Sequence, residues 1–225
     1  MGITAENVAR KYKVTRQEQD QYAYGSYLKT YKALKNKYFK NELCQTTLKD
    51  EVRAATTLTK LSQLKPVFKT KGSVSAGNAS SLNDGAAFLA LASSDYIKAN
   101  KIKPLAKVLA WSSSAGNPDY MGITPITAIQ KLMKKMSVNI SFFDLVEINE
   151  AFAATSVAVQ RSLQIDPNKL NIVGGAIALG HPIGCSGTRI VTTLAHQLKR
   201  TKKKFGVASM CIGGGQGLAM AIEKL

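Results

Sequence analysis

Cysteine, histidine and long apolar runs are scarce in this sequence of 225 residues. Its three cysteines, Cys44, Cys185 and Cys211, are odd in number and far apart. That pattern argues against a disulfide framework or a zinc knuckle and favours a reducing compartment. No apolar run approaches the length that crosses a membrane. Residues 1–13 lack the apolar core of a secretory signal, and the early Glu6 does not suit a matrix-targeting peptide.

Acidic residues are also few, since 14 Asp and Glu stand against 31 Lys and Arg, for a net charge of +17. The lysines gather in residues 29–40, 131–135 and 199–204. Three interpretations fit this surplus: a nucleic-acid surface, a phosphate-bearing small ligand, or a solvated basic surface. Neither an RGG repeat nor an alternation of aromatic and basic residues accompanies the lysines, so nucleic acid is the least favoured of the three.

Glycine, by contrast, is concentrated around one of the two histidines, in NIVGGAIALGHPIGCSGTRI at residues 171–190. An apolar run at 170–173 leads into this stretch with strand character, and the residues after Gly184 follow helical spacing. The pattern predicts that His181 lies on a tight loop between a strand end and a helix start, where α/β folds place ligands. A tight turn with an incidental histidine is the plain alternative.

The rest of the chain divides into two compositions. Residues 1–75 are polar, lysine-rich and mostly helical, with a capping box of Thr15 and Glu18 that begins a long helix. Residues 76–92 are small and turn-forming, then apolar, and they predict a loop, a short buried helix and a strand. From Lys103 onward, alternating elements predict an α/β layered sheet covered by helices. The predicted strands are 105–111, 144–148, 170–173, 205–212 and 218–223, and the predicted helices are 125–136, 150–163 and a segment ending near Lys199.

Two further stretches lie at the ends of predicted strands. Asn149 follows one strand and opens a helix, where a helix cap is the plain alternative. Cys211 ends another strand before the glycines 213–215, and its plain alternative is a buried small residue before a turn. Loops at one edge of a parallel sheet can converge, so His181, Cys211 and Asn149 are predicted to share a site. A histidine beside a cysteine suits thiol chemistry, because imidazole exchanges protons near neutral pH.

Several longer motifs resemble those of the thiolase family, close to acetyl-CoA acetyltransferases. The family's C-terminal signatures are similar to NEAF at 149–152, GGAIALGHPIG at 174–184 and CIGGGQG at 211–217. Its loop-domain and linker signatures are similar to MGITAENVA at 1–9, LKPVF at 64–68, AGNAS at 76–80 and LNDGAA at 82–87. These matches follow the family's order along nearly the whole chain.

The resemblance implies thioester-dependent acyl transfer, as a Claisen condensation or a thiolysis, with acetyl-CoA or acetoacetyl-CoA as substrate, in fatty-acid or ketone-body metabolism. It implies that His181 activates a nucleophilic cysteine and that Cys211 moves the proton on the α-carbon of acetyl-CoA. Asn149 would hold a water that joins His181 in one oxyanion hole, and the Gly213 amide would contribute to a second.

Coenzyme A enters such a reaction as part of the substrate, so neither a cofactor nor a metal is expected. Within the resemblance, Ser80 would bond the pantetheine amide and Arg53 would lie by the adenine. The positions implied as coenzyme A contacts are Met1, Arg53, Phe68, Ala76, Ser80, Leu82, Ala151 and Phe152.

Thiolases consist of two similar βαβαβαββ halves, and the first half carries the nucleophilic cysteine in a C-x-S-G-like motif that this sequence lacks. Cys44 lies in a lysine-rich context unlike that motif. The resemblance implies a mostly helical loop domain with a remnant linker at 1–82, a segment of the N-terminal half-domain at 83–102, and the C-terminal βαβαβαββ domain at 103–225. The N-terminal half-domain is otherwise expected to be absent, which would leave the apolar segment from residue 83 uncovered.

Two functions remain open. The chain is either part of a working thiolase, completed by another chain or by upstream sequence, or a catalytically inactive structural subunit of a larger assembly. The intact His181, Cys211 and Asn149 favour the first. Both imply a homo- or hetero-oligomer, with no nucleic acid and no membrane span, and the isolated chain is expected to be inactive without an acyl-accepting cysteine. The basic charge and the resemblance favour the mitochondrial matrix, with cytosol and peroxisome also open.

Overall fold

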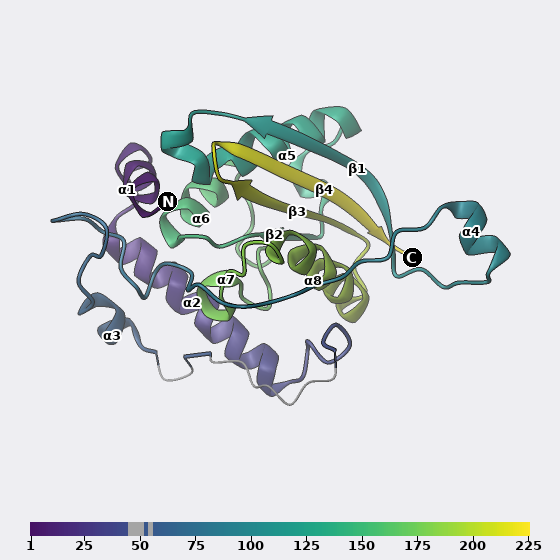
Figure 1. Ribbon diagram of the computed structural model, residues 1–225, viewed down its shortest axis with the longest axis horizontal. Helices are drawn as coiled ribbons and strands as arrows, with labels where there is room; N and C mark the ends of the chain where they lie inside the picture. The colour runs from purple at the N-terminus through teal and green to yellow at the C-terminus, as the bar shows by residue number, and fades with distance from the viewer. Residues whose placement is uncertain (45–51, 54–55) are drawn as a thin grey trace.

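The computed structural model describes residues 1–44, 52–53 and 56–225. Among these residues, strands β1 (Ala106–Ala115), β2 (Leu145–Ile148), β3 (Phe205–Ile212) and β4 (Gln216–Lys224) form one sheet in the order β1-β4-β3-β2 (Figure 1). Only the pair β2–β3 is parallel, while β3–β4 and β1–β4 are antiparallel. The α/β class was therefore predicted correctly, but the sheet is mixed, because β3 returns directly into β4 through the glycine turn at 213–215.

Helices cover both faces of this sheet. On one face, α5 (Thr124–Met136) and α6 (Ala153–Ser162) enclose a core that includes Ile129, Phe143 and Val207. On the other face, α8 (Ser186–Thr201) packs Leu194 and Leu198 against the sheet. The apolar positions of α5 recur at helical spacing, which explains why one side of that helix is buried. None of the helices within the described residues combines the length and apolarity needed to cross a membrane.

The helices predicted in the first third of the chain are present among its described residues as α1 (Gly2–Lys11), α2 (Arg16–Lys35) and α3 (Leu58–Ser62). The predicted capping box is confirmed: the Glu18 amide donates to Thr15 Oγ1 over 3.2 Å, and the Thr15 amide donates to Glu18 Oε2 over 2.7 Å. Helix α2 packs against α6 and against the short α7 (Ala176–Leu179), so it reaches the stretch that contains His181. Two 3-10 helices, Pro118–Ile123 and Ile140–Phe142, lie in the connections between strands.

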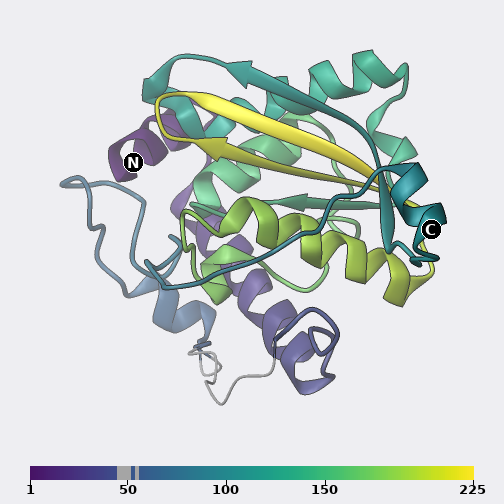
Figure 2. The ribbon, with the colours of Figure 1, turned by 45° about the vertical axis from the view of Figure 1, so that its right-hand side comes forward.

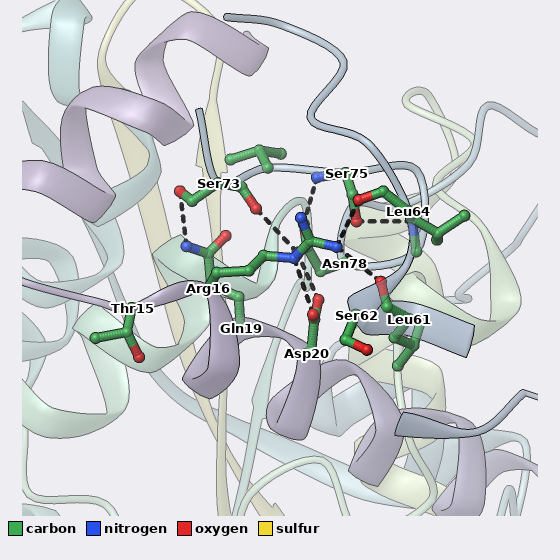
Figure 3. A network of polar contacts seen from close by, with 12 residues as sticks. Thr15, Arg16, Gln19, Asp20, Leu61, Ser62, Leu64, Ser73, Ser75 and Asn78 are labelled. Atoms are coloured by element: carbon green, nitrogen blue, oxygen red, sulfur yellow. Dashed lines mark hydrogen bonds and ion pairs between the residues drawn. The ribbon is translucent and has the colours of Figure 1, made fainter. Parts of the chain in front are cut away.

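A polar network on α2 fixes the turn at residues 73–78 (Figure 3). Arg16 Nε donates to Asp20 over 2.8 Å, and Arg16 Nη2 donates to the carbonyls of Leu61 and Leu64. Asn78 Nδ2 donates to Asp20 Oδ1 over 2.9 Å, and its backbone carbonyl accepts from the Ala153 amide over 2.8 Å. The network thereby ties α2 and the AGNAS segment to the start of α6.

Residues 170–173 were predicted to form a strand, and this prediction is wrong. Leu170 makes only an isolated parallel bridge with Val146 of β2, because Asn171 takes a left-handed conformation with φ of 44°. The Asn171 side chain takes the place of further strand-to-strand hydrogen bonds. Its Oδ1 accepts from the Ile148 amide over 2.8 Å, and its Nδ2 donates to the Ile148 carbonyl over 2.9 Å. The outer side of β2 is therefore bonded to residues 169–171 without a fifth strand there.

The opposite edge of the sheet is β1, and α5 reaches it with two lysines. Lys131 Nζ donates to the Ser113 carbonyl over 3.3 Å, and Lys135 Nζ donates to the Trp111 carbonyl over 3.4 Å. Lys135 also lies over the Trp111 ring, 5.5 Å from its centroid. Two residues of the lysine cluster 131–135 therefore have a local role at the sheet edge.

The predicted short buried helix and strand within residues 76–92 are also absent. Residues 81–93 contain neither helix nor strand, and the helix that follows, α4 (Ser94–Ala99), buries none of its residues. Phe88 is 92% exposed and Leu91 is 80% exposed. Both ribbon views show this segment crossing the molecule to α4, which stands apart from the sheet near the C-terminus (Figures 1 and 2). An apolar run does not form the predicted elements here because no described part of the chain packs over residues 86–93.

Candidate active site

Asn149 and His181 meet at the end of β2. Asn149 follows the strand directly, and its backbone amide donates to the Ser209 carbonyl of β3 over 3.0 Å. His181 follows α7, and its backbone amide donates to the Ser81 carbonyl over 2.9 Å. Asn149 Nδ2 then lies 3.3 Å from His181 Nε2, with both side chains buried. Asn149 is not a helix cap, because α6 begins at Ala153 and not at the predicted residue 150.

Ser186, a residue not predicted for the site, determines which nitrogen of the His181 ring carries the hydrogen. Its Oγ lies 2.6 Å from His181 Nδ1 and donates to the Pro182 carbonyl over 3.0 Å. Because a serine hydroxyl has only one hydrogen to donate, Ser186 accepts from Nδ1–H of the ring. The lone pair of a neutral His181 is therefore on Nε2 and faces the Asn149 amide. The sequence signal for Ser186 was a hydroxyl residue five positions after the histidine, in the same loop.

The charge state of His181 follows from its surroundings. Burial and, second, the charge of Arg189 lower the pKa of His181 below its ordinary value. The imidazole is therefore neutral at pH 7 and can accept a proton at Nε2. Asn149 Oδ1 is buried without a hydrogen-bond partner among the described residues. Since an unpaired buried carbonyl oxygen costs about 1–3 kcal/mol, a ligand or water that donates to it would bind favourably.

Cys211 occupies the same end of the sheet, two residues beyond Ser209 on β3. Its side chain packs in an apolar cluster with Ala5, Val74 and Phe152. Burial raises the pKa of the Cys211 thiol to about 11, so the group is a protonated thiol at neutral pH. The apolar cluster fits the alternative in which Cys211 is a buried small residue. Its position fits the other prediction, of a thiol at the end of a strand.

Gly213 lies in the turn between β3 and β4, followed by two glycines with positive φ. A side chain built at Gly213 would meet no atom within 4 Å, so its backbone borders open space. The structure therefore gives Asn149 and His181 a direct contact and places Cys211 and Gly213 on the adjoining strand end.

Glu150 is the second residue that the sequence did not single out. It is 1% exposed and accepts four hydrogen bonds. The donors are Tyr22 and Ser26 on α2, Asn171, and the backbone amide of Ile177. A Cβ built at Gly175 would lie 2.5 Å from the Glu150 carboxyl carbon, so the residue at 175 must be glycine for the loop to approach. This carboxylate therefore joins the helical region to the loop that leads to His181.

For the neighbouring Glu147, on β2, the described part of the chain provides no such set of donors. It is 2% exposed, and burial raises its pKa to about 8 despite the opposing charge of Arg189. Among the described residues, no group of three His, Cys, Asp or Glu side chains could hold a metal ion.

The predicted coenzyme A contacts fall into three groups. Ser80 Oγ donates to the Ala151 carbonyl over 3.0 Å, and the Phe68 and Phe152 rings meet edge to face at 6.0 Å. Gly2 lies so close to the Phe68 ring that any side chain there would collide with it, which brings exposed Met1 to the same region.

Arg53 and Ala76 form the second group, because Arg53 Nη1 donates to the Ala76 carbonyl over 3.4 Å. Both line a small hollow together with Ser81 and Tyr27. Leu82 stands alone, since it is 85% exposed. A wider, open hollow is formed by residues 65–71 and includes Phe68. The structure therefore places most of these positions in two groups of local contacts but leaves Leu82 in solvent.

Comparison with known proteins gives matches along the whole chain. Residues 102–224 match the model of the thiolase C-terminal domain, and residues 1–95 match that of the thiolase N-terminal domain. The chain is 45% identical over 234 residues to the mitochondrial 3-ketoacyl-CoA thiolase of Rattus norvegicus, covering 99% of this chain and 59% of the relative. The Bacillus anthracis acetyl-CoA acetyltransferase structure superposes with a TM-score of 0.96 at 44% identity, over 100% of this chain and 60% of the other.

A second structure, human mitochondrial 3-ketoacyl-CoA thiolase in complex with CoA, gives a TM-score of 0.92 at 43% identity, over 100% of this chain and 59% of that one. The chain thus spans about 60% of the length of these relatives. The match at residues 1–95 corrects the expectation that the N-terminal domain is absent. The expectation failed because residues 1–82 were assigned to a separate loop domain and only 83–102 to the N-terminal half-domain, whereas residues 1–95 match the N-terminal domain model.

Proposed function

Because the chain belongs to the thiolase family, we propose that it supplies the histidine, the asparagine and one cysteine of a site for acyl transfer between thioesters. One observation carries the proposal, the hydrogen-bond chain from Ser186 through His181 to Asn149. A histidine held as a neutral base has the character needed to activate a thiol. Once Nε2 carries the proton it can donate to an oxyanion, and a water held by the free Asn149 oxygen can donate to the same oxyanion.

The proposed chemistry follows from the protonation of each group. His181 Nε2 accepts the proton of a nucleophilic cysteine, whose thiolate attacks the thioester carbonyl of acetyl-CoA in condensation, with release of coenzyme A, or the 3-keto carbon of acetoacetyl-CoA in thiolysis. In thiolysis the carbon–carbon bond breaks, and the protonated Cys211 gives its proton to the α-carbon of the departing enolate. In condensation the same proton moves the other way, and Cys211 must first be a thiolate. A raised pKa therefore suits the acid role at neutral pH better than the base role.

The nucleophilic cysteine is not one of the three in this sequence, as argued from the missing C-x-S-G motif. We therefore propose that it comes from a second protein region or chain, with acetyl-CoA or acetoacetyl-CoA as substrate. The hollow beside Arg53 and the contacts around Ser80 are the proposed place for coenzyme A. The mitochondrial matrix stays a prediction, because the matching relatives include mitochondrial and bacterial proteins.

The alternative, a catalytically inactive structural subunit, is favoured by one observation: Cys211 is packed among apolar side chains, as a residue with only a packing role would be. The two functions differ in whether Cys211 exchanges protons with a bound thioester.

The test is exchange of the methyl protons of acetyl-CoA with D2O, followed by NMR, since this partial reaction requires no nucleophilic cysteine. We expect the chain to accelerate exchange and Cys211→Ala to reduce it by about 100-fold. Cys185→Ala is the matched control, because Cys185 is equally buried at 6% exposed. The rate should increase as the pH rises toward 11, since the thiolate is the base. Exchange that is unchanged by Cys211→Ala, or no exchange at saturating acetyl-CoA, would favour the structural subunit.

A further inference from the structure

Glu150 comes directly after Asn149, and its two carboxylate oxygens bind different segments of the chain. Oε1 accepts from Asn171 Nδ2 over 2.9 Å, and Oε2 accepts from the Ile177 amide over 3.3 Å. Each oxygen also accepts from one hydroxyl group of α2, over 3.2 and 2.6 Å respectively. One buried side chain therefore connects the segment at Asn171 with the segment at Ile177.

The first oxygen is connected to the strand end that carries Asn149. The Asn171 side chain bonds the amide and the carbonyl of Ile148, the last residue of β2. Because Asn171 Nδ2 also donates to Glu150, the carboxylate keeps this side chain in the orientation that serves both backbone groups. The chain therefore leaves β2 in a fixed direction, and Asn149 is the next residue.

The second oxygen is connected to α7, the short helix that leads to His181. The Ile177 amide lies in the first turn of α7, where a helix offers no carbonyl of its own to accept it. Glu150 accepts this amide, and Ser26 accepts from the Gly175 amide over 3.1 Å while it donates to Glu150. The start of α7 is therefore attached to the same carboxylate.

We propose that Glu150 is a positioning residue, which holds the Asn149 side chain against His181 Nε2 by attaching the segments that carry both residues to one point. The contact between them measures 3.3 Å and joins residues 32 positions apart in the sequence. The inference rests on the proposed function only in treating this contact as part of the site.

This role requires two acceptor oxygens. Asn171 Nδ2 and the Ile177 amide can only donate, and they face different oxygens of Glu150. A glutamine of the same size has one oxygen and one NH2 group. In either orientation of its amide, the NH2 group would face one of these two donors. Glu150→Gln should therefore release one of the two segments.

The test is NMR of the full chain labelled with 13C and 15N. The nuclear Overhauser effect between the Asn149 Nδ2 hydrogens and the carbon-bound hydrogens of the His181 ring reports how close the two side chains lie. The ring is readily assigned, because His196 is the only other histidine. We expect Glu150→Gln to lose most of this signal at a temperature where circular dichroism shows the variant to be folded. If Glu150 only stabilised the fold, the folded variant would keep the signal.

Glu6→Gln is the matched control. Glu6 is also buried, at 8% exposed, and its oxygens accept from the backbone amides of Ser73 and Val74 over 2.8 to 3.0 Å. These bonds join α1 to the turn at residues 73–74. We expect Glu6→Gln to lower the thermal stability and to keep the signal between Asn149 and His181.

Two residues of α2, one helical turn apart, keep the test decisive if Glu150→Gln does not fold. Ser26→Ala removes a donor from Oε2 and leaves the Gly175 amide without its acceptor, so the signal should weaken. Tyr22→Phe removes a donor from Oε1 but leaves Asn171 bonded there, so the signal should remain.

Four results would overturn the inference. They are no signal in the unsubstituted chain, full signal in folded Glu150→Gln, an equal loss in Glu6→Gln, and an equal loss in Ser26→Ala and Tyr22→Phe. The third would trace the loss to a loosened fold, and the fourth to the packing of α2. The readout requires no substrate, so failure of the acetyl-CoA exchange test leaves this inference standing, and the reverse is also true.

Discussion

The loop around His181 and the segment at residues 86–93 are similar in sequence but opposite in structure. Both are rich in glycine or alanine and both carry large apolar residues. The residues just before the second segment lie against the loop, since the Ser81 carbonyl accepts from the His181 amide and a side chain at Gly85 would collide with Pro182. Residues 174–178 are nevertheless all buried, whereas Phe88 and Leu91 are almost fully exposed.

The two segments differ in the polar side chains that accept hydrogen bonds from their backbone amides. Glu150 and Ser26 bind the amides of Ile177 and Gly175, so the glycine loop can be buried without unpaired donors. Residues 86–93 have no such acceptors from elsewhere in the described chain. Apolar composition is thus insufficient for burial. The glycine loop has both packing partners and a buried carboxylate that accepts from its backbone, whereas no described part of the chain packs over residues 86–93.

The largest expected effect comes from removing that carboxylate. Glu150→Ala leaves the hydroxyls of Tyr22 and Ser26 and the Asn171 amide without their acceptor, and should lower the free energy of unfolding by about 4 kcal/mol. Urea denaturation followed by circular dichroism measures it. The control is Glu223→Ala, a partly exposed partner of Lys204, which should cost less than about 1 kcal/mol. Equal losses in the two variants would contradict the role given to Glu150.

A smaller effect is expected from pH. The pKa of Glu147 is about 8 in the folded chain against an ordinary value of 4.5, so the folded state holds a proton that the unfolded state releases. Stability should therefore fall as the pH rises from 5 to 8, by roughly 3.5 kcal/mol from this residue. Glu147→Gln cannot ionise and should remove that part of the slope. Parallel stability curves for both proteins over this range would rule the explanation out.

Ser186→Ala tests the hydrogen bond that orders the His181 ring. Losing an acceptor for Nδ1–H should cost about 1 kcal/mol of unfolding free energy. The same change should make the 15N signals of His181 report a mixture of tautomers. Ser62→Ala is the comparison, since Ser62 only donates to the Thr59 carbonyl on an exposed surface. A single unchanged tautomer in Ser186→Ala would show that Asn149 alone orders the ring.

The smallest effect is expected in the exposed segment. Phe88→Ser should change the free energy of unfolding by less than about 0.5 kcal/mol, because the ring is 92% exposed. Phe143→Ala, at a fully buried phenylalanine, should cost about 3–5 kcal/mol in the same thermal or urea measurement. A loss above about 1 kcal/mol in Phe88→Ser would show that residues 86–93 pack against the chain in solution.

The sequence predicted the elements whose signals are local. Strand β3 at 205–212, helix α5 and the capping box at Thr15 and Glu18 were confirmed, because spacing and end groups decide them. The strand predicted at 170–173 failed, since the left-handed Asn171 and its bonds to Ile148 depend on residues more than twenty positions away. The elements predicted within 76–92 failed for a related reason, as apolar residues require something to pack against.

At the candidate site, the contact between His181 and Asn149 could be anticipated from strand ends. The supporting groups could not. Ser186 looks like an ordinary residue of a helix start, and Glu150 resembles any acidic residue near a helix. Their importance comes from burial and from partners in other elements, which one-dimensional spacing does not report.

The side chains that close the two outer strands limit how this sheet can grow. Exposed strand edges normally attract further strands, which is the usual path to edge-to-edge aggregation and to strand exchange between molecules. Here the Asn171 amide and the backbone of residues 169–171 bond the outer side of β2, while Lys131 and Lys135 hold carbonyls of β1 and add positive charge there. A further strand would have to displace these hydrogen-bonding groups at either edge. Extension of the sheet by a further strand is therefore disfavoured at both edges.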